Sequence, residues 1–193
     1  MTERFQRVPW VVAAALSIGA GVIHFALGPE HVVELGPLGY GFYVSGALQV
    51  GWAAILALAL LMPRGRDAKP AFRKLVQAGI AINVAILAAW AISRVVGLPA
   101  GETPWTPEAI GRPDAIGGIL EGVLTLGLLG SLRNWTIGPV TSSRWFSLGA
   151  ALALSAIVVG TVVAITPDDA DQMAGHDQGP GTMMMTPEGG RPG

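Results

Sequence analysis

The sequence predicts an all-α integral membrane protein, a bundle of five transmembrane helices. Of its 193 residues, 51% are hydrophobic and only 13% are charged, about half the charged fraction of an average soluble domain. The hydrophobic residues are also grouped in blocks of about 20, the length of helix that crosses the apolar core of a bilayer. The net charge of -1 argues against nucleic-acid binding. The lack of cysteine excludes disulfides and thiolate metal sites.

Five segments are predicted to cross the membrane. The first begins after two arginines, as a signal peptide does, but its apolar stretch is longer than the apolar region of a signal peptide, so we expect a retained helix. The fourth is the least apolar, because it is short and contains Glu121. We expect Pro29 to start a short, separate interfacial helix after the first span. The predicted spans are residues 8–27, 40–62, 75–96, 114–132 and 145–165.

Basic residues predict the orientation of the bundle. Cytoplasmic loops of membrane proteins carry an excess of lysine and arginine, and nine of the twelve basic residues fall on one side of the predicted bundle. This places the N-terminus in the cytoplasm and the C-terminus outside, in the multi-pass topology of a bacterial inner-membrane protein. The nine residues are Arg4, Arg7, Arg64, Arg66, Lys69, Arg73, Lys74, Arg133 and Arg144. The helical bundle should cover residues 1–166, and the tail, 167–193, is too polar and too rich in glycine and proline to fold alone.

Two imidazoles and two carboxylates lie within eleven residues at the outer end of the first span. They are His24, Glu30, His31 and Glu34. Such a set can bind a divalent metal ion or relay protons, although its spacing matches no strict metal-binding signature. In the alternative structural interpretation, His24 bonds a neighbouring helix and the other three residues are solvated.

Four further polar residues lie in or at the ends of the predicted spans, where polar groups are costly and commonly functional. They are Gln49, Arg94, Asp114 and Glu121. We expect these groups in the outer half of the bundle and an inner half that is largely apolar. A carboxylate in low-dielectric surroundings is either protonated or paired, and the candidate partners of Glu121 are His24, Arg94 and Gln49. Glu121 is therefore either a proton or cation site or one half of a structural ion pair with Arg94.

The C-terminal tail combines thioether and imidazole groups. Thioethers are soft ligands that suit Cu(I), and imidazole binds either oxidation state of copper. The tail can thus act as a copper-binding segment, or it is an inert low-complexity sequence. The candidate ligands are Met173, His176, Met183, Met184 and Met185.

The motif HFxxxPEHxxE, which runs from His24 to Glu34, is followed later by Ser93-Arg94 and Gly97-Leu98-Pro99. These motifs resemble those of a group of small bacterial polytopic membrane proteins of unknown function. The resemblance covers roughly the first four spans and implies a glutamate in the following helix, but no activity. The composition of the tail is similar to the Met/His-rich tails of extracytoplasmic copper-handling proteins.

Three functions remain open from the sequence. The first is binding or handling of a metal ion, with copper favoured, at the outer face. The second is a proton- or cation-coupled transporter component that uses Glu121, in a homo-oligomer or larger membrane complex, because five spans are few for a monomeric carrier. The third is a redox subunit that holds haem or quinone. No nucleophile is flanked by a credible base, which argues against an enzyme.

Overall fold

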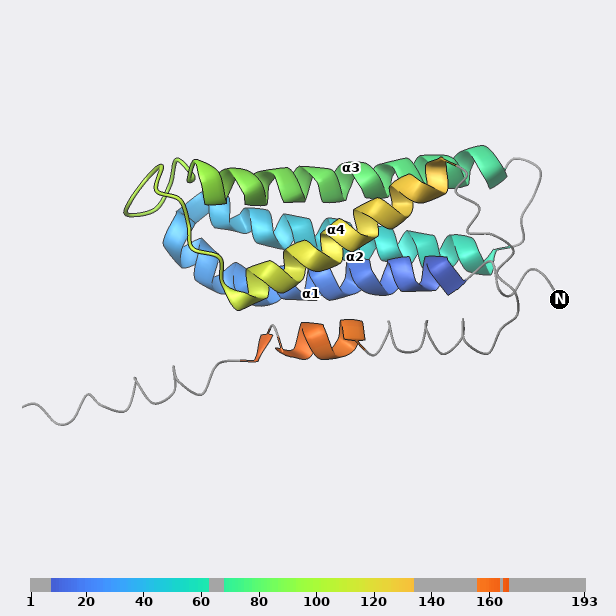
Figure 1. Cartoon of the computed structure of the whole chain (residues 1–193), viewed down its shortest axis with the longest axis horizontal. Coiled ribbons are helices and arrows are strands. Elements are labelled where there is room, and N and C mark those ends of the chain that lie inside the picture. Colours follow the sequence, from blue (N-terminus) through green and yellow to red (C-terminus); the bar gives the residue numbers. More distant parts are fainter. Residues whose placement is uncertain (1–7, 63–67, 134–155, 164, 167–193) are drawn as a thin grey trace, which may run out of the picture.

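The computed structural model describes residues 8–62, 68–133, 156–163 and 165–166. Within these ranges the chain is helical and contains no strand, which confirms the predicted all-α class (Figure 1). The elements in chain order are α1 (Val8–Leu35), a 3₁₀ turn η2 (Gly36–Gly39), α2 (Tyr40–Leu61), α3 (Ala68–Val95) and α4 (Arg112–Leu132). A short helical segment, residues 156–163, follows.

The expectation of a separate helix that starts at Pro29 is wrong, because α1 continues through this proline to Leu35. Proline lacks an N–H group and costs the helix one backbone hydrogen bond, but packing against a neighbouring helix supports α1 here. A Cβ atom at Gly28 would lie only 2.7 Å from the ring of Tyr43 on α2, so the two helices are in close contact next to the proline. The first span is therefore longer than the predicted 8–27.

Glycines end α1 and allow the tight turn into α2. Gly36 has a φ of 58°, the left-handed conformation that commonly ends a helix, and Pro37 follows it. A Cβ atom at Gly39 would overlap the backbone of His31, so any larger residue would push α1 and α2 apart. Together these residues reverse the chain within four positions.

Two other helix starts differ from the prediction. α3 begins at Ala68, seven residues before the predicted start, so that Arg73 and Lys74 are exposed helical residues and not part of a loop. Lysine and arginine are good helix formers. The predicted span began later because it was defined by apolar residues, and the first turns of α3 are charged. α4 begins at Arg112, and near its start the Gly111 backbone N–H donates to the Asp114 carboxylate at 3.3 Å.

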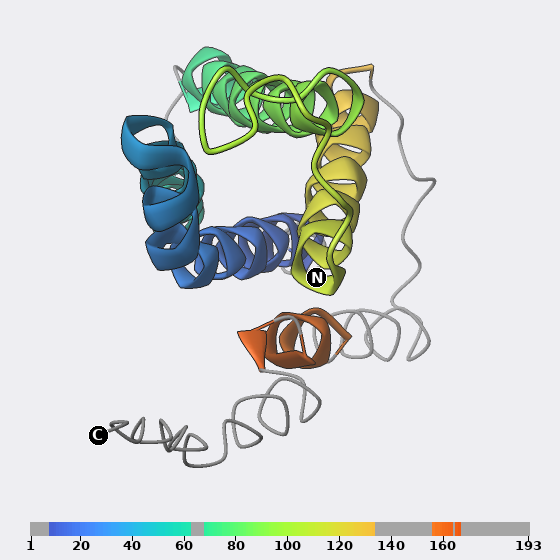
Figure 2. The same ribbon diagram turned by 90° about the vertical axis from the view of Figure 1, so that its left-hand side faces the viewer.

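The four long helices form a square ring, in which each helix packs against two neighbours (Figure 2). Segment 156–163 lies outside this ring against α1 and α4, where Ile157 and Thr161 approach Gly19 and Gly160 approaches Ile116. The Arg112 side chain donates a hydrogen bond to the Thr166 carbonyl at 3.0 Å. Most of the predicted fifth span, residues 145–155 and 164, lies outside the described residues, and so does the tail.

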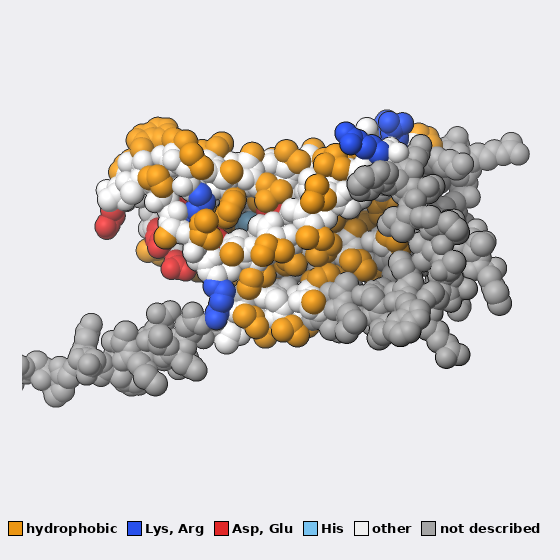
Figure 3. Space-filling view, viewed as in Figure 1, with side chains coloured by type: hydrophobic (Ala, Val, Ile, Leu, Met, Phe, Trp, Pro, Cys, Tyr) orange, Lys and Arg blue, Asp and Glu red, His pale blue; other side chains and the backbone are white. Residues whose placement is uncertain are grey.

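The outer surface of the described helices is apolar, as expected of a membrane protein (Figure 3). Three helical stretches are long and apolar enough to cross a membrane: Pro9–Leu61, which contains α1, η2 and α2, then Pro70–Val95, and Arg112–Leu132. The number of five spans and their orientation stay predictions. We call the end where α3 begins, with Arg73 and Lys74, the basic end. The opposite end, which carries Glu30, Glu34, Glu102, Glu108 and Asp114, is the acidic end.

Candidate functional site

Each of the four long helices contributes one polar side chain to the centre of the ring. His24 is the seventeenth of 28 residues in α1, Gln49 the tenth of 22 in α2, and Asn83 the sixteenth of 28 in α3. Glu121 is the tenth of 21 residues in α4. Gln49, Asn83 and Glu121 are 0%, 1% and 2% exposed, and the side chain of His24 is 16% exposed. All four residues lie near the middle of their helices, in the half toward the acidic end. Only His24 is clearly deeper than expected, because the predicted first span ended three residues after it and α1 continues to Leu35.

We call His24, Gln49, Asn83 and Glu121 the central site. Hydrogen bonds to a backbone carbonyl decide which side-chain atoms of the two amides donate and which accept. The Gly79 carbonyl can only accept, and it accepts from Asn83 Nδ2 at 2.8 Å. Asn83 therefore turns its Oδ1 toward Gln49, whose Nε2 donates to it at 3.3 Å. The same Gln49 Nε2 donates to Glu121 Oε1 at 2.7 Å. A backbone carbonyl thus orients two amides so that an N–H group points at the carboxylate.

The imidazole of His24 is the second donor to Glu121. His24 Nε2 lies 2.8 Å from Glu121 Oε1. An ionised carboxylate can only accept, so when Glu121 is ionised the Nε2 of His24 carries a proton and donates it. With a neutral ring and an ionised carboxylate the pair has a charge of -1, and one further proton makes it neutral. The site can therefore exist in two charge states that differ by one proton.

Three buried polar atoms around this pair have no hydrogen-bond partner among the described residues: His24 Nδ1, Gln49 Oε1 and Thr125 Oγ1. Thr125 follows Glu121 by one helical turn on α4, so its hydroxyl lies on the same face. Ser17 on α1 is also buried, but its hydroxyl donates to the backbone carbonyl of Gln49 at 2.9 Å. Most buried polar groups in proteins are paired, so unpaired atoms concentrated here distinguish this region from an ordinary core.

Beyond these polar residues the core is apolar as far as the basic end. The side chains that fill it between the helices are fully or almost fully buried, and they carry no titratable group. They are Ala13, Leu16, Ala53, Leu56, Leu60, Val76 and Leu128. The prediction of a largely apolar inner half is confirmed for this part of the described core, and the central site has no polar connection through it to the basic end.

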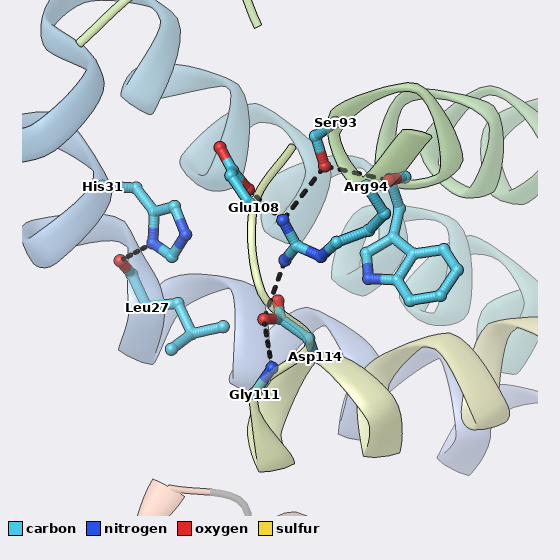
Figure 4. A network of polar contacts seen from close by, with 8 residues as sticks. Leu27, His31, Ser93, Arg94, Glu108, Gly111 and Asp114 are labelled. Carbon is cyan, nitrogen blue, oxygen red and sulfur yellow. Dashed lines mark hydrogen bonds and ion pairs between the residues drawn. The ribbon is translucent and has the colours of Figure 1, made fainter. Parts of the chain in front are cut away.

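At the acidic end a second polar cluster surrounds Arg94 (Figure 4). Its Nη2 lies 2.8 Å from Asp114 Oδ2, and its Nη1 donates to Glu108 and, at 3.2 Å, to Ser93 Oγ. The cluster links the end of α3 to the start of α4 and to the connection between them. Because its guanidinium is occupied in this way, Arg94 does not form the predicted ion pair with Glu121.

The four residues predicted as a loop metal site do not converge. His24 bonds Glu121, while His31 Nδ1 donates to the Leu27 carbonyl at 3.0 Å (Figure 4). Glu30 and Glu34 are exposed. Since α1 continues through this region, consecutive residues point about 100° apart around the helix, as 3.6 residues per turn requires. Within the described part of the chain, no three histidine, aspartate or glutamate side chains are close enough to hold a metal ion. The tail residues Met173, His176, Met183, Met184 and Met185 lie outside the described residues, and copper binding there stays a prediction.

Sequence reasoning did not single out Asn83 as a member of the site, nor Thr125 and Ser17 as its polar neighbours. Helical spacing contained a signal for two of them. Thr125 is four residues from Glu121, and Ser17 is seven residues from His24, so each shares a face with a residue that was singled out. Asn83 had no such signal, because its place depends on which helices are neighbours.

The chain matches no family model, no curated protein and no solved structure with which it was compared. The functional argument therefore depends on the geometry of the site alone.

Proposed function

We propose that this chain is a polytopic membrane protein whose Glu121–His24 pair binds and releases one proton as part of a proton-coupled process. The observation that carries the proposal is the 2.8 Å contact between a buried carboxylate and an imidazole in the middle of the bundle. Intramembrane carboxylates and histidines recur as proton relays in pumps and transporters.

The charge of the pair supports a role in proton binding. Gln49 and Asn83, the other members of the site, are neutral amides. The nearest charged cluster holds Arg94, Glu108 and Asp114, and Asp114 precedes Glu121 by seven residues, about 10 Å along the helix axis. The charge of the pair therefore changes from -1 to zero when a proton binds. Proton binding thus removes the net charge of the pair, and an uncompensated charge in low-dielectric surroundings is costly.

Access to the pair is expected from one side only. Apolar side chains such as Leu56 and Leu128 fill the core toward the basic end, whereas His24 is partly exposed and lies on the side of the acidic end. By the distribution of basic residues, we place the acidic end outside the cell. A site with one open side binds and releases protons at that side, and it does not form a continuous proton channel in the described conformation.

Infrared difference spectroscopy on protein in lipid nanodiscs tests the proposal. Acidification of the wild type should produce the C=O band of a protonated carboxyl group that is shielded from water, and Glu121→Gln should remove this band. Glu30→Gln is the matched control, because Glu30 is an exposed glutamate, and this variant should keep the band. Absence of the band in the wild type, or its persistence in Glu121→Gln, would overturn the proposal.

A further inference from the structure

Two histidines of α1 contact the same aromatic ring on α2. His31 stacks on Phe42, with ring centroids 3.8 Å apart and an angle of 30° between the planes. His24 meets the same ring edge-on at 5.7 Å. Because α1 continues through Pro29, His24 and His31 lie on one face of a single helix, seven residues apart. The ring of Phe42 therefore lies between the partly exposed His31 and the central site.

The two imidazoles present complementary nitrogens. His31 Nδ1 donates to the Leu27 carbonyl, so in the neutral ring its Nε2 has a lone pair that can take a proton from water. In His24 the Nε2 donates to Glu121, and Nδ1 is the nitrogen that has no partner. A proton can thus enter at His31 Nε2 and reach the pair at His24 Nδ1. The Leu27 carbonyl fixes the tautomer of His31, and ionised Glu121 favours the tautomer of His24 that this direction of transfer requires.

From this arrangement we infer that His31 is the surface proton acceptor of the central site and that Phe42 is the gate between His31 and His24. The inference rests on the proposed protonation of the Glu121–His24 pair. Phe42 has no polar side-chain atom, so it can neither accept nor donate the proton. A water molecule can bridge the two imidazoles only when the ring moves aside. In the transfer, His31 Nε2 loses the proton that it took from water, and His24 Nδ1 gains a proton. His24 Nε2 then passes its own proton to Glu121 Oε1, and no oxidation state changes.

Other charged and titratable groups surround the entrance. Glu30 and Glu34 lie on α1, Tyr40 and Tyr43 lie on α2, and Arg94, Glu108 and Asp114 belong to the acidic end. Glu30 and Glu34 are exposed to solvent, and the Arg94 side chain is engaged in its own ion pairs. Of these groups, none has a described contact with the ring of Phe42 or with the free nitrogen of His24. His31 is therefore the titratable group, besides His24, whose ring has a described contact with Phe42.

The test measures how fast the infrared band of protonated Glu121 appears after a pH jump. Phe42→Ala should raise this rate about tenfold, the effect of removing about 1.4 kcal/mol from the barrier. His31→Gln should lower the rate by a similar factor. Tyr43→Phe is the control, because it keeps an aromatic ring on the same helix, and its rate should equal that of the wild type. The final amplitude of the band should be unchanged in all three variants, because the central pair is intact.

A second measurement separates the gate from the proposed function. Hydrogen–deuterium exchange of the His24 ring N–H, followed by NMR, reports the access of water even if the pair takes up no proton in the working pH range. Faster exchange in Phe42→Ala, with wild-type exchange in Tyr43→Phe, supports the gate. Unchanged band kinetics and unchanged exchange in Phe42→Ala would overturn the gate, even if the wild type shows the protonated carboxyl. Wild-type kinetics in His31→Gln would overturn the role of His31.

Discussion

Replacing Glu121 with alanine removes the acceptor of two interhelical hydrogen bonds at once. Glu121 Oε1 accepts from Gln49 at 2.7 Å and is 2.8 Å from His24. Hydrogen bonds between membrane helices contribute about 0.6 kcal/mol on average and about 1.7 kcal/mol at most. The loss of two such bonds should therefore reduce the free energy of unfolding by about 1–3 kcal/mol. Glu121→Gln keeps an oxygen acceptor and the shape of the side chain, and we expect it to cost less than about 1 kcal/mol.

A double-mutant cycle isolates the contact between His24 and Glu121. The free energy of unfolding is measured in lipid for His24→Ala, Glu121→Ala and the double variant, and the coupling energy should be about 0.6–1.7 kcal/mol, the contribution of one hydrogen bond. Ser131→Ala serves as the control partner for His24→Ala, because Ser131 lies ten residues from Glu121, about 15 Å along α4. These two changes should be additive. A coupling between His24 and Glu121 as small as that of the control would refute the contact.

Three further changes test other parts of the structure. Thr125→Val removes a buried hydroxyl that has no described partner while keeping the shape of the side chain, so the melting temperature should stay the same or rise; a clear fall would show that the hydroxyl is paired. Gly39→Ala should lower the free energy of unfolding by about 1–3 kcal/mol, because the new methyl group overlaps the His31 backbone. Gly41→Ala should be tolerated, because a Cβ atom there points into open space. Equal stability of the two variants in thermal unfolding would contradict the turn geometry. Asp114→Asn weakens one ion pair of the acidic end, and limited proteolysis should cut the connection 96–111 faster than in Glu102→Gln, an exposed control.

The sequence was sufficient to predict the helical class and two of the three partners proposed for Glu121. Helical membrane segments are long apolar blocks, so they are visible without knowledge of the packing. His24 and Gln49 were recognisable as polar residues within such blocks, and the structure brings both to the carboxylate. The third candidate, Arg94, is not a partner of Glu121, which the sequence cannot show because it does not show how the connection 96–111 folds. That connection brings Glu108 next to Arg94.

The depth of His24 could not be read from the sequence, for a local reason. Proline usually ends a helix, so the predicted first span stopped before Pro29 and His24 fell near its end. In the structure, α1 continues through the proline, next to the close contact between Gly28 and α2. His24 therefore lies three turns from the helix end. Asn83 was missed for a different reason, because only the ring order of the helices brings α3 beside α2 at this level.

The charge state of the Glu121–His24 pair is the quantity on which the account depends, and NMR of isotope-labelled protein in bilayers measures it directly. The ¹⁵N signals of the His24 ring and the ¹³C signal of the Glu121 carboxyl are followed together while the pH is lowered. We predict that both signals change in the same step, with the uptake of one proton by the pair, and that Glu121→Gln alters the His24 titration. Independent titration of the two groups, or a His24 titration that is unchanged in Glu121→Gln, would contradict the account.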